Sequence, residues 1–351
     1  MHLSNAMRTG FEKGPVMNTL TRDTLLLSRP INRLQRDIVP ACAINCTDIA
    51  SPPEYLQAQV TGLVHDSLAH NSRRAYASDL KRFLNWGGKI PATDIMIANY
   101  LAEHAETNSP STIVRWITSL AKAHRASGDL DPTRCELVRS VVRGIRRRYG
   151  APPDRANPLS QKLLFQVLDE VGAGVKDARD RALLLVGFAG GFRRSELIGL
   201  DYADIEFVPA GITLNIRRSK TDQYGEGRVI GIPYARGRHC PVLALRDWLT
   251  CSCISEGPLF RLVNRHSQLG SRRLSGEAVS LVVKARLTAI QVDPTRYSGH
   301  SLRSGFATSA AQAGAPSWKI RAQTGHASDA MLSKYILDAE MFVDNAAGAI
   351  L

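Results

Sequence analysis

The sequence predicts a mainly α-helical protein, in which an all-α domain is followed by a mainly helical α+β domain with a small antiparallel sheet. Three observations predict this fold. Apolar residues recur at helical spacing through residues 54–148, where no strand pattern of convincing length is found. Residues 149–158 hold three prolines and a glycine, a composition typical of an extended linker. Beyond them, short alternating segments typical of strands occur among further helices.

The chain has 351 residues, which is long for a single hydrophobic core, so we expect two domains. Residues 1–50 show weak apolar periodicity and several prolines, and we expect an N-terminal arm that is partly disordered. The all-α domain is predicted over residues 51–148, the linker over 149–158 and the second domain over 159–337. Residues 338–351 are apolar enough to predict a short C-terminal helix.

Four helices are predicted in the all-α domain from their caps and apolar spacing. Ser72 is the expected N-cap of a helix over 73–86, and a second helix is expected over 93–105. A third is expected to start at Ser111, and a fourth to run over 132–148 from a proline in its first turn. The first of these helices is expected to bury four side chains, Tyr76, Leu80, Phe83 and Leu84.

The second domain is predicted to start with a helix at Ser160 and to continue with a buried helix around 180–189. Three short strands are then expected, over residues 204–208, 211–218 and 228–232. The last two can form a hairpin across residues 221–227. Helices are expected to dominate from Pro241 to the end of the chain.

The net charge is +13 and the sequence pI is about 9.7, which indicates a polyanionic partner. An anionic membrane surface is the competing interpretation, but it favours a single basic amphipathic helix. Here arginine recurs through the chain, and arginine suits bidentate contacts to phosphate. We therefore favour nucleic acid. The candidate contact residues are Arg73, Arg74, Lys81, Lys122, Arg143, Arg146, Arg147, Arg148, Arg217, Arg218, Arg272 and Arg273.

Several cell locations are disfavoured by the sequence. The longest apolar run, residues 182–192, is far shorter than the ~20 residues of a membrane-spanning helix. The N-terminal residues lack the apolar stretch of a signal peptide, and the six cysteines form no CxxC pair. We therefore expect a cytoplasmic protein with reduced thiols. A metal site is disfavoured, because one candidate group fits no zinc pattern: His239, Cys240, Cys251 and Cys253.

The residues best suited to chemistry begin at Gly190, where an apolar helix ends in two glycines and a new helix starts at once. Arg193 and Glu196 are three residues apart, so they share one face of that helix. A surface ion pair is the plain interpretation of this spacing. An unpaired charge is costly beside a buried apolar segment, however, so we expect Arg193 at the floor of a cleft.

Three further features follow in the sequence. Lys220 lies where a strand enters its turn, and such a lysine is usually only solvated. His300 and Arg303 share a helix face, and a serine and a glycine before them leave the helix N-terminus accessible to an anion. His326 lies at a turn, and Tyr335 follows it in the next predicted helix. Each feature is common by itself, and only their combination in this order indicates a function.

The order of these residues resembles the tyrosine recombinase, or phage integrase, family. Its first box reads roughly Thr-Gly-Leu-Arg-x-Ser-Glu-Leu, and residues 190–197 match it with Gly190 in place of threonine and Phe192 in place of leucine. Its second box, His-x-Leu-Arg, matches residues 300–303, and its Leu-Gly-His box corresponds to Thr-Gly-His at residues 324–326. The context of the second box looks especially like the Cre branch, although this chain has histidine in the third box where Cre has tryptophan.

The resemblance implies that Tyr335 attacks a DNA phosphodiester. Arg193 and Arg303 would bracket the non-bridging oxygens and stabilise the charge of the transition state. His326 would add a hydrogen bond to one of these oxygens. A free tyrosine has a pKa near 10, and His300 is the residue expected to accept or orient the phenol proton.

Two more residues complete the expected catalytic set. Lys220 would protonate the departing 5′-oxygen, and Glu196 would orient the pocket through His300 or through Arg193. No carboxylate cluster suited to two divalent cations is seen in the sequence, so we expect chemistry without a metal or another cofactor. No P-loop is seen either, and a covalent intermediate conserves the bond energy, so ATP is not expected.

The resemblance also implies the reaction and the partners. The expected function is site-specific DNA recombination through a 3′-phosphotyrosine intermediate and a Holliday junction. The expected partners are double-stranded DNA sites and three further copies of the chain, with a monomer in the absence of DNA. The apolar tail, 338–351, would insert into a neighbouring protomer, whereas packing on its own domain is the plain alternative.

Two other functions remain open at this stage. A type IB topoisomerase uses similar chemistry as a monomer, but the all-α first domain and the apolar tail argue against it. A non-catalytic DNA-binding or architectural protein could be built on the same scaffold. Such a protein has no need of Tyr335 or Lys220, so the complete series of residues favours the recombinase.

Overall fold

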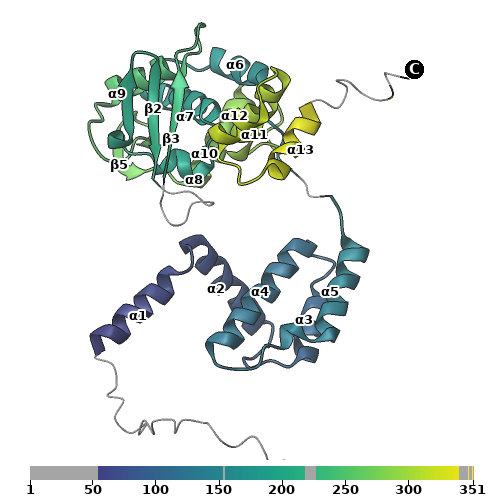
Figure 1. Ribbon diagram of the computed structural model, residues 1–351. Coiled ribbons are helices and arrows are strands. Elements are labelled where there is room, and N and C mark those ends of the chain that lie inside the picture. The colour runs from purple at the N-terminus through teal and green to yellow at the C-terminus, as the bar shows by residue number, and fades with distance from the viewer. Residues whose placement is uncertain (1–53, 153–154, 218–226, 340–346, 348–349, 351) are drawn as a thin grey trace, which may run out of the picture. The chain divides into compact units, whose positions relative to one another are not determined.

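The computed structural model describes residues 54–152, 155–217, 227–339, 347 and 350 (Figure 1). The chain divides into two compact units, Met1–Ser67 and Leu68–Leu351. Of the first unit, the structure describes one helix, α1 (Glu54–Asp66). The predicted N-terminal arm over residues 1–50 lies outside the described residues.

The second unit begins with a group of helices that contains no strand within its described residues, as predicted. Its elements are α2 (His70–Asn85), α3 (Asp94–Glu103), α4 (Pro110–Ala126), the 3-10 turn η1 (Pro132–Arg134) and α5 (Glu136–Tyr149). Helices α3 and α4 begin at side-chain caps. Thr93 Oγ1 accepts a hydrogen bond from Met96 N at 3.1 Å, and Ser109 Oγ accepts one from Thr112 N at 3.3 Å.

Three details of the predicted helices are wrong. The third helix was expected to start at Ser111, but α4 begins at Pro110, directly after its N-cap Ser109. Ser72 is not an N-cap, because its own N–H already donates to the carbonyl of Ala69 at 2.9 Å and the helix begins at His70. The predicted fourth helix is broken at Cys135, whose extended backbone separates η1 from α5. The break follows from the side chain of Asp131, which accepts a hydrogen bond from the backbone N–H of Thr133 and closes a separate short turn.

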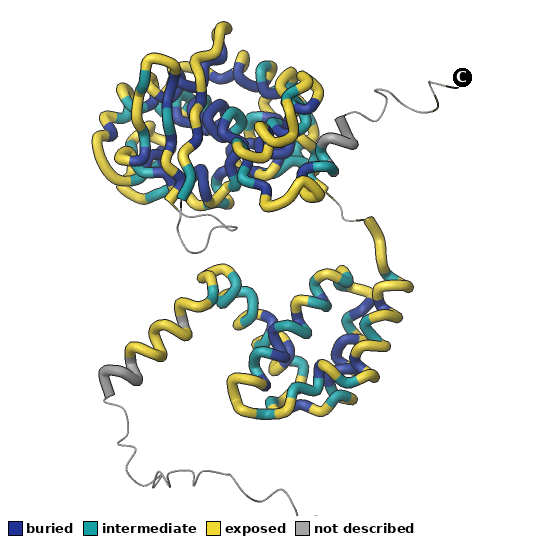
Figure 2. The backbone as a smooth tube through the Cα atoms, in the orientation of Figure 1, coloured by how far each residue is buried: buried dark blue, intermediate teal, exposed yellow. Residues whose placement is uncertain are grey.

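The buried residues of this helical group, dark blue in Figure 2, form one hydrophobic core that contains three aromatic side chains. Phe83, Tyr100 and Trp116 are at most 1% exposed, and the rings of Tyr100 and Trp116 lie 5.2 Å apart between centroids. Tyr76 and Leu80 are half-buried. Leu84 was expected in the core but is 47% exposed, because adjacent residues on a helix point about 100° apart and Phe83 takes the inward direction.

The rest of the second unit has its own, larger core (Figure 2). Its helices are α6 (Gln161–Asp169), α7 (Val175–Ala189), α8 (Arg194–Gly199), α9 (Pro241–Ser252), α10 (Gly276–Ala289), α11 (His300–Gln312), α12 (Ser317–Thr324) and α13 (Asp329–Ala339). Ser160 caps α6, accepting a hydrogen bond from Leu163 N, so the predicted start at Ser160 is confirmed. The predicted buried helix is α7, from which residues 182–187 are all buried.

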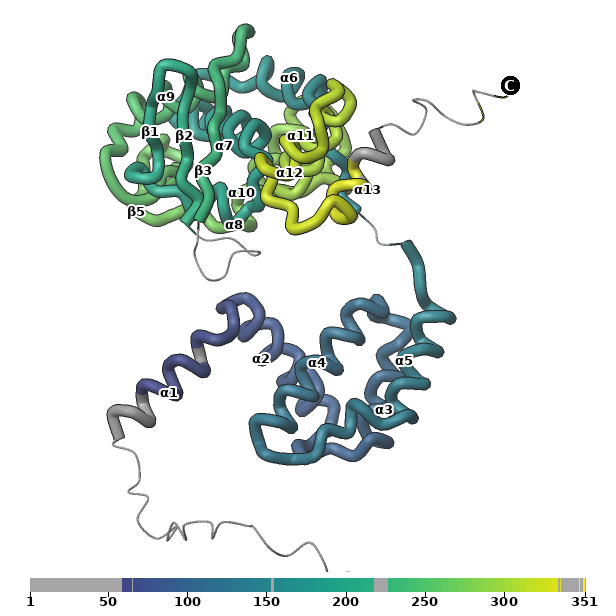
Figure 3. Tube along the Cα trace, viewed as in Figure 1, coloured from purple at the N-terminus to yellow at the C-terminus, as the bar shows by residue number. Residues whose placement is uncertain are grey.

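A short 3-10 turn, η2 (Tyr202–Asp204), leads into the predicted sheet. Strands β1 (Ile205–Val208), β2 (Gly211–Ile216) and β3 (Arg228–Pro233) are antiparallel and lie in this order (Figure 3). Leu214 pairs with Ile205 on one side and with Ile230 on the other. The predicted pairing is confirmed, and β2 ends at Ile216, two residues earlier than expected.

A second hairpin was not predicted. It consists of β4 (Arg261–Val263) and β5 (Leu269–Arg273), which pair antiparallel with an irregular register. Helices still dominate after Pro241, as expected, and this hairpin is the part that the sequence did not reveal. Both strands are short and rich in arginine, so they lack the alternating pattern that reveals a strand in a sequence.

The two hydrophobic cores lie on either side of the predicted linker in the sequence: one draws on residues 83–145 and the other on residues 159–302. The end of the predicted linker is bound to the second group, since Asn157 N donates to the carbonyl of Arg296 at 2.7 Å. The exact domain boundaries remain a prediction.

Helix α13 ends at Ala339, two residues into the predicted C-terminal helix. Most of the predicted helix over 338–351 lies outside the described residues. Among the residues that the structure does describe, no helix has both the length and the apolar character needed to cross a bilayer.

Candidate active site

The turn between α7 and α8 places the first of the predicted site residues. Gly191 has a positive φ of 57°, and a Cβ atom there would lie 2.8 Å from the Cγ2 atom of Thr324. Only glycine satisfies both conditions without displacing its neighbours. Arg193 then precedes α8 in an extended conformation, and its backbone N–H donates to Glu196 Oε2 at 3.0 Å.

Glu196 is fully buried between two guanidinium groups. Its Oε1 lies 2.6 Å from Nη1 of Arg193, and its Oε2 lies 3.0 Å from Nη2 of Arg228, on β3. The exposed fraction of the Arg193 side chain is 15%, so the pair is not a surface ion pair. The expectation that Arg193 lies at the floor of a cleft is confirmed, because Arg193 lines the cleft together with His300, Arg303, His326 and Tyr335.

Arg303 projects from α11 and is 2% exposed. Its Nη1 donates to the carbonyls of Gly191, at 2.9 Å, and of Thr324. Burial is the main cause that lowers the pKa of Arg303, to about 10, and the neighbouring charge of Arg193 adds to it. The guanidinium therefore remains charged at neutral pH.

Three arginines converge on the C-terminal end of α12. Arg228 Nη1 donates to the carbonyls of Ala322, at 3.3 Å, and Gln323, at 3.0 Å, while Arg193 Nη2 donates to the carbonyl of Gly325 at 2.9 Å. Arg303 bonds the carbonyl between them, that of residue 324. The last carbonyls of a helix lack partners within the helix and carry partial negative charge, so this end orients the guanidinium groups.

His326 follows α12 directly. Gly325 ends the helix in the left-handed conformation, with φ of 65°, and turns the chain so that His326 enters the site. His326 is 7% exposed, and its Nδ1 lies 2.7 Å from Oγ1 of Thr324. Burial and then the charges of Arg303 and Arg193 lower the pKa of His326 to about 3, so the imidazole is neutral at pH 7.

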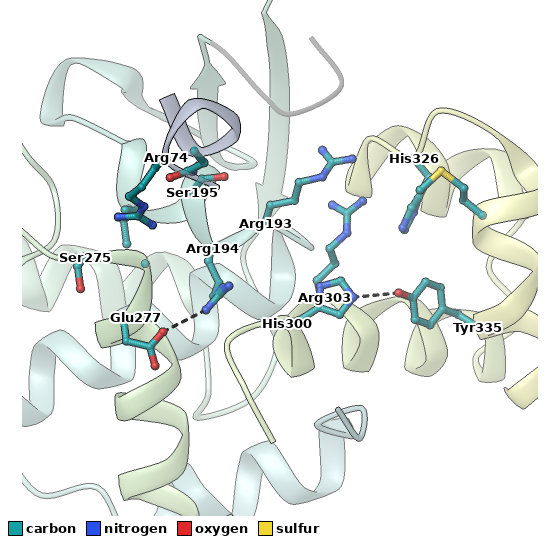
Figure 4. Close-up of a pocket in the computed structure, with 14 residues that line it drawn as sticks. Arg74, Arg193, Arg194, Ser195, Ser275, Glu277, His300, Arg303, His326 and Tyr335 are labelled. Carbon is teal, nitrogen blue, oxygen red and sulfur yellow. Dashed lines mark hydrogen bonds and ion pairs between the residues drawn. The ribbon is translucent and has the colours of Figure 1, made fainter. Parts of the chain in front are cut away.

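Tyr335 projects from α13 toward His300 (Figure 4). The phenol oxygen lies 3.0 Å from Nε2 of His300, and the ring centroids of Tyr335 and His326 are 5.7 Å apart. The tyrosine ring also packs against a small apolar cluster that includes Ala307 and Leu332. Desolvation and then the charges of Arg303, Arg194 and Arg193 lower the pKa of His300.

The structure thus brings together six of the seven predicted catalytic residues. They come from the turn before α8, from α8 itself, from α11, from the loop after α12 and from α13. Glu196 contacts Arg193 and not His300, which settles the alternative that the sequence left open. Lys220 lies outside the described residues.

Among the predicted DNA contacts, the exposed residues are Arg74, Lys81, Arg143, Arg146, Arg147, Arg148, Arg217 and Arg272. Several candidates are engaged within the protein: Arg143 pairs with Glu136, and Arg217 lies 2.6 Å from Asp204. Arg273 is half-buried and holds the carbonyls of residues 198 and 200 as well as a carboxylate, so its role is structural. Arg218 lies outside the described residues.

Sequence reasoning missed two residues of the site. Arg228 was assigned only to the start of a strand, and Thr324 only to the first position of the Thr-Gly-His box, with no role of its own. The contact of Arg228 with Glu196 joins residues 32 positions apart, and it forms only when β3 packs near α8. The contact of Thr324 with His326 is local, but it depends on the turn at Gly325. For Thr324 a weak signal existed, since it replaces the leucine of the Leu-Gly-His box.

Comparison with known proteins identifies the family. The model of the phage integrase family matches residues 159–340. An integrase/recombinase described as a xerD homolog, from Selenomonas ruminantium, is 36% identical over 303 residues, which cover 84% of this chain and 89% of that protein. The chain therefore belongs to the phage integrase family, and it is a site-specific tyrosine recombinase. These relatives do not distinguish the Cre-like branch, which remains a prediction.

Two solved structures share the fold. A lambda integrase dimer bound to a COC′ core site has a TM-score of 0.56 at 19% identity, with 84% of this chain and 99% of that chain covered. A lambda integrase tetramer bound to a Holliday junction has a TM-score of 0.54 at 19% identity, with 83% and 79% covered. At this level of identity the two structures support the fold alone.

Proposed function

We propose that this recombinase cleaves and rejoins DNA strands by attack of Tyr335 on a phosphodiester, through a 3′-phosphotyrosine intermediate. The single observation that carries the proposal is the phenol oxygen of Tyr335, 3.0 Å from Nε2 of His300 in a cleft also lined by Arg193 and Arg303. A nucleophile, a proton acceptor and two phosphate-binding groups meet in one cleft.

The two arginines of the cleft supply the positive charge that phosphoryl transfer requires. Arg193 and Arg303 reach the cleft from different elements, and each is held by carbonyls of the 324–325 turn. A guanidinium has five N–H donors, so each arginine keeps donors for the non-bridging oxygens of a phosphate. Because the groups are already oriented, little reorganisation is needed when charge builds up in the transition state.

The proton of Tyr335 passes to Nε2 of His300 as the phenol oxygen bonds to phosphorus. The bond from phosphorus to the 5′-oxygen breaks, and the 5′-oxygen takes a proton from Lys220. The reverse steps then join a new 5′-hydroxyl to the 3′-phosphotyrosine. The role of Lys220 rests on the sequence resemblance, since this residue lies outside the described part of the chain.

The pH dependence of cleavage follows from the lowered pKa of His300. A histidine with a lowered pKa stays neutral, and able to accept a proton, down to a pH below its ordinary value of about 6.5. We expect the single-turnover cleavage rate to fall as the pH drops through the pKa of His300 in the DNA complex. Replacing Arg194 with glutamine removes one positive charge near His300 and should raise its pKa. The cleavage rate should then begin to fall at a higher pH. An unchanged pH dependence of the cleavage rate would argue against His300 as the proton acceptor.

Arg228 is expected to affect the cleavage rate although it is not placed to touch the phosphate. It shares the buried charge of Glu196, so that Arg193 is not left as the only partner of that carboxylate. Arg228→Met should lower the cleavage rate by roughly 10- to 100-fold, the usual cost of losing an outer-shell partner. Arg238→Met is the matched control, because Arg238 is 74% exposed and its ion pair within the described residues is a surface contact with Asp169. Equal rates for the two variants would contradict this role.

DNA is the partner, and the proposed assembly is a tetramer that forms on two DNA sites and exchanges strands through a Holliday junction. The support is the net charge of +13 and the structural neighbours, which include a lambda integrase tetramer bound to a Holliday junction. We propose that the protein is a monomer without DNA. Sedimentation with and without a cognate site tests both statements.

The proposed function is tested by incubating the full chain with fragmented genomic and plasmid DNA that carries nicks, so that a cleaved strand diffuses away and the protein stays attached. Sequencing of the attached DNA is expected to reveal an enriched sequence, and two duplexes with this sequence should then exchange strands. Relaxation of supercoiled plasmids that lack the sequence would favour the topoisomerase. Binding without any attached DNA would favour the non-catalytic protein.

A further inference from the structure

Thr324 makes three side-chain hydrogen-bond contacts at the end of α12, of which the contact to the carbonyl oxygen of Arg321, at 3.5 Å, is the longest. The residue is fully buried, with an exposed fraction of 0%. Its Oγ1 lies 2.7 Å from the carbonyl oxygen of Ile320, one turn earlier, and 2.7 Å from Nδ1 of His326, two residues later. The hydroxyl therefore connects the helix backbone to the imidazole ring that lines the cleft.

The number of available protons determines the direction of the hydrogen bonds at the Thr324 hydroxyl. A carbonyl oxygen only accepts hydrogen bonds, so the single proton of the Thr324 hydroxyl is directed to Ile320. The hydroxyl oxygen is then left with lone pairs facing Nδ1 of His326. A short contact of 2.7 Å is favourable only if Nδ1 carries the proton and donates it to Oγ1.

We propose that Thr324 is a positioning residue that fixes the ring proton of His326 on Nδ1, so that Nε2 is the nitrogen that serves the bound phosphate. The consequence for catalysis rests on the proposed function, whereas the position of the proton does not. The family box has leucine at this position, and leucine has no group that can accept from Nδ1. In this chain the threonine supplies the accepting oxygen.

The charge of the imidazole follows from its surroundings. The groups that act on it are the guanidiniums of Arg193, Arg228 and Arg303 and the ring of His300, all of which disfavour a further positive charge. Together with burial they keep the ring neutral, with its pKa near 3, in the protein without DNA. In this state Nε2 has a lone pair and no proton, and it cannot donate to a phosphate oxygen.

We expect that a DNA phosphate bound in the cleft changes the protonation of His326. An anionic phosphate between Arg193 and Arg303 offsets the charges that lower the pKa of His326. The ring then takes up one proton from solvent on Nε2, and the new N–H donates to a non-bridging oxygen. The Nδ1 proton stays on the Thr324 hydroxyl throughout. DNA binding at the cleft is therefore coupled to the uptake of one proton by His326.

The position of the proton is tested in the full chain with histidine rings labelled with ¹⁵N, using His326→Gln to assign the signals. At pH 7.5 without DNA, we expect Nδ1 of His326 to show the shift of a protonated nitrogen and Nε2 that of an unprotonated one. The opposite assignment in the wild-type protein overturns the proposal by itself, even if no variant folds.

Three variants separate the hydroxyl contact from packing. Thr324→Val keeps the shape and loses the hydroxyl, so a mixture of the two neutral ring forms is expected. Thr324→Ser keeps the hydroxyl and should restore the wild-type spectrum. Thr288→Val is the matched control, because the Thr288 hydroxyl also bonds the carbonyl four residues earlier, at 3.0 Å, and contacts no histidine. An unchanged His326 spectrum in Thr324→Val contradicts the proposal.

The consequence for the reaction is tested with the DNA sequence recovered from the covalent adducts. On binding, Nε2 of His326 in the wild type should gain the shift of a protonated nitrogen, and Thr324→Val should cleave roughly tenfold more slowly, with rescue in Thr324→Ser. Normal cleavage by Thr324→Val contradicts the coupling. If the wild-type protein forms no adduct with any DNA, the proposed function is wrong. The position of the His326 ring proton is still decided by the spectrum of the free protein.

Discussion

Replacement of Tyr335 with phenylalanine is expected to abolish covalent attachment to DNA and to leave DNA affinity within about twofold of the wild type. The change removes one oxygen atom, which is both the proposed nucleophile and the partner of His300 at 3.0 Å. The ring itself packs against Ala307 and Leu332, and phenylalanine keeps that packing. The proposed mechanism assigns the attack to this oxygen alone, so the loss should be complete within detection.

This prediction is measured on a nicked substrate with the recovered sequence. Denaturing gels report the covalent adduct, and gel shifts report affinity. Tyr202→Phe is the matched control, because Tyr202 is 39% exposed on η2 and has no part in the site. An adduct that persists in Tyr335→Phe at more than a trace would assign the attack to another residue.

Replacement of Arg303 with alanine is the second large effect. Losing one preorganised donor to a developing oxyanion typically costs 10²- to 10³-fold, and Arg303 presents a full guanidinium, so we expect a decrease in the single-turnover rate of about 10³-fold. The folded state should also lose roughly 1–3 kcal/mol, because the buried carbonyls of Gly191 and Thr324 lose their charged donor.

The loss of cleavage rate and the loss of folding stability are separated by the temperature of the assay. Cleavage is measured well below the unfolding midpoint of the variant, which thermal unfolding determines. Arg303→Lys keeps a positive charge but not the planar fork, so it should restore only part of the rate. A folded Arg303→Ala protein that cleaves within tenfold of the wild type would remove Arg303 from the proposed mechanism.

The parts of the fold that follow from local chemistry were predicted well. Thr93 and Ser160 bond N–H groups three residues ahead, and such caps can be read from a sequence. Ser72 has the same chemistry but lies inside α2, because the chain already enters the helix at His70. The hairpin of β4 and β5 escaped notice because its strands carry little apolar alternation.

The site shows the same division between local and distant contacts. The ordered series from Arg193 to Tyr335 was sufficient to name the residues that line the cleft. The partner of Glu196 was not predictable, because Arg228 lies on another element and meets the carboxylate only through packing. The proton on His326 depends on a hydroxyl whose direction is set by the helix carbonyl of Ile320, and no sequence motif reports that direction.

The most direct test of the account is to identify the residue and the bond that join protein to DNA. The trapped adduct is digested with protease and nuclease, and the remaining nucleotide–peptide is fragmented in a mass spectrometer. The account predicts a single modified peptide, in which Tyr335 carries a nucleotide through a 3′-phosphate. Attachment at another residue, or a tyrosine linked through a 5′-phosphate, would contradict it.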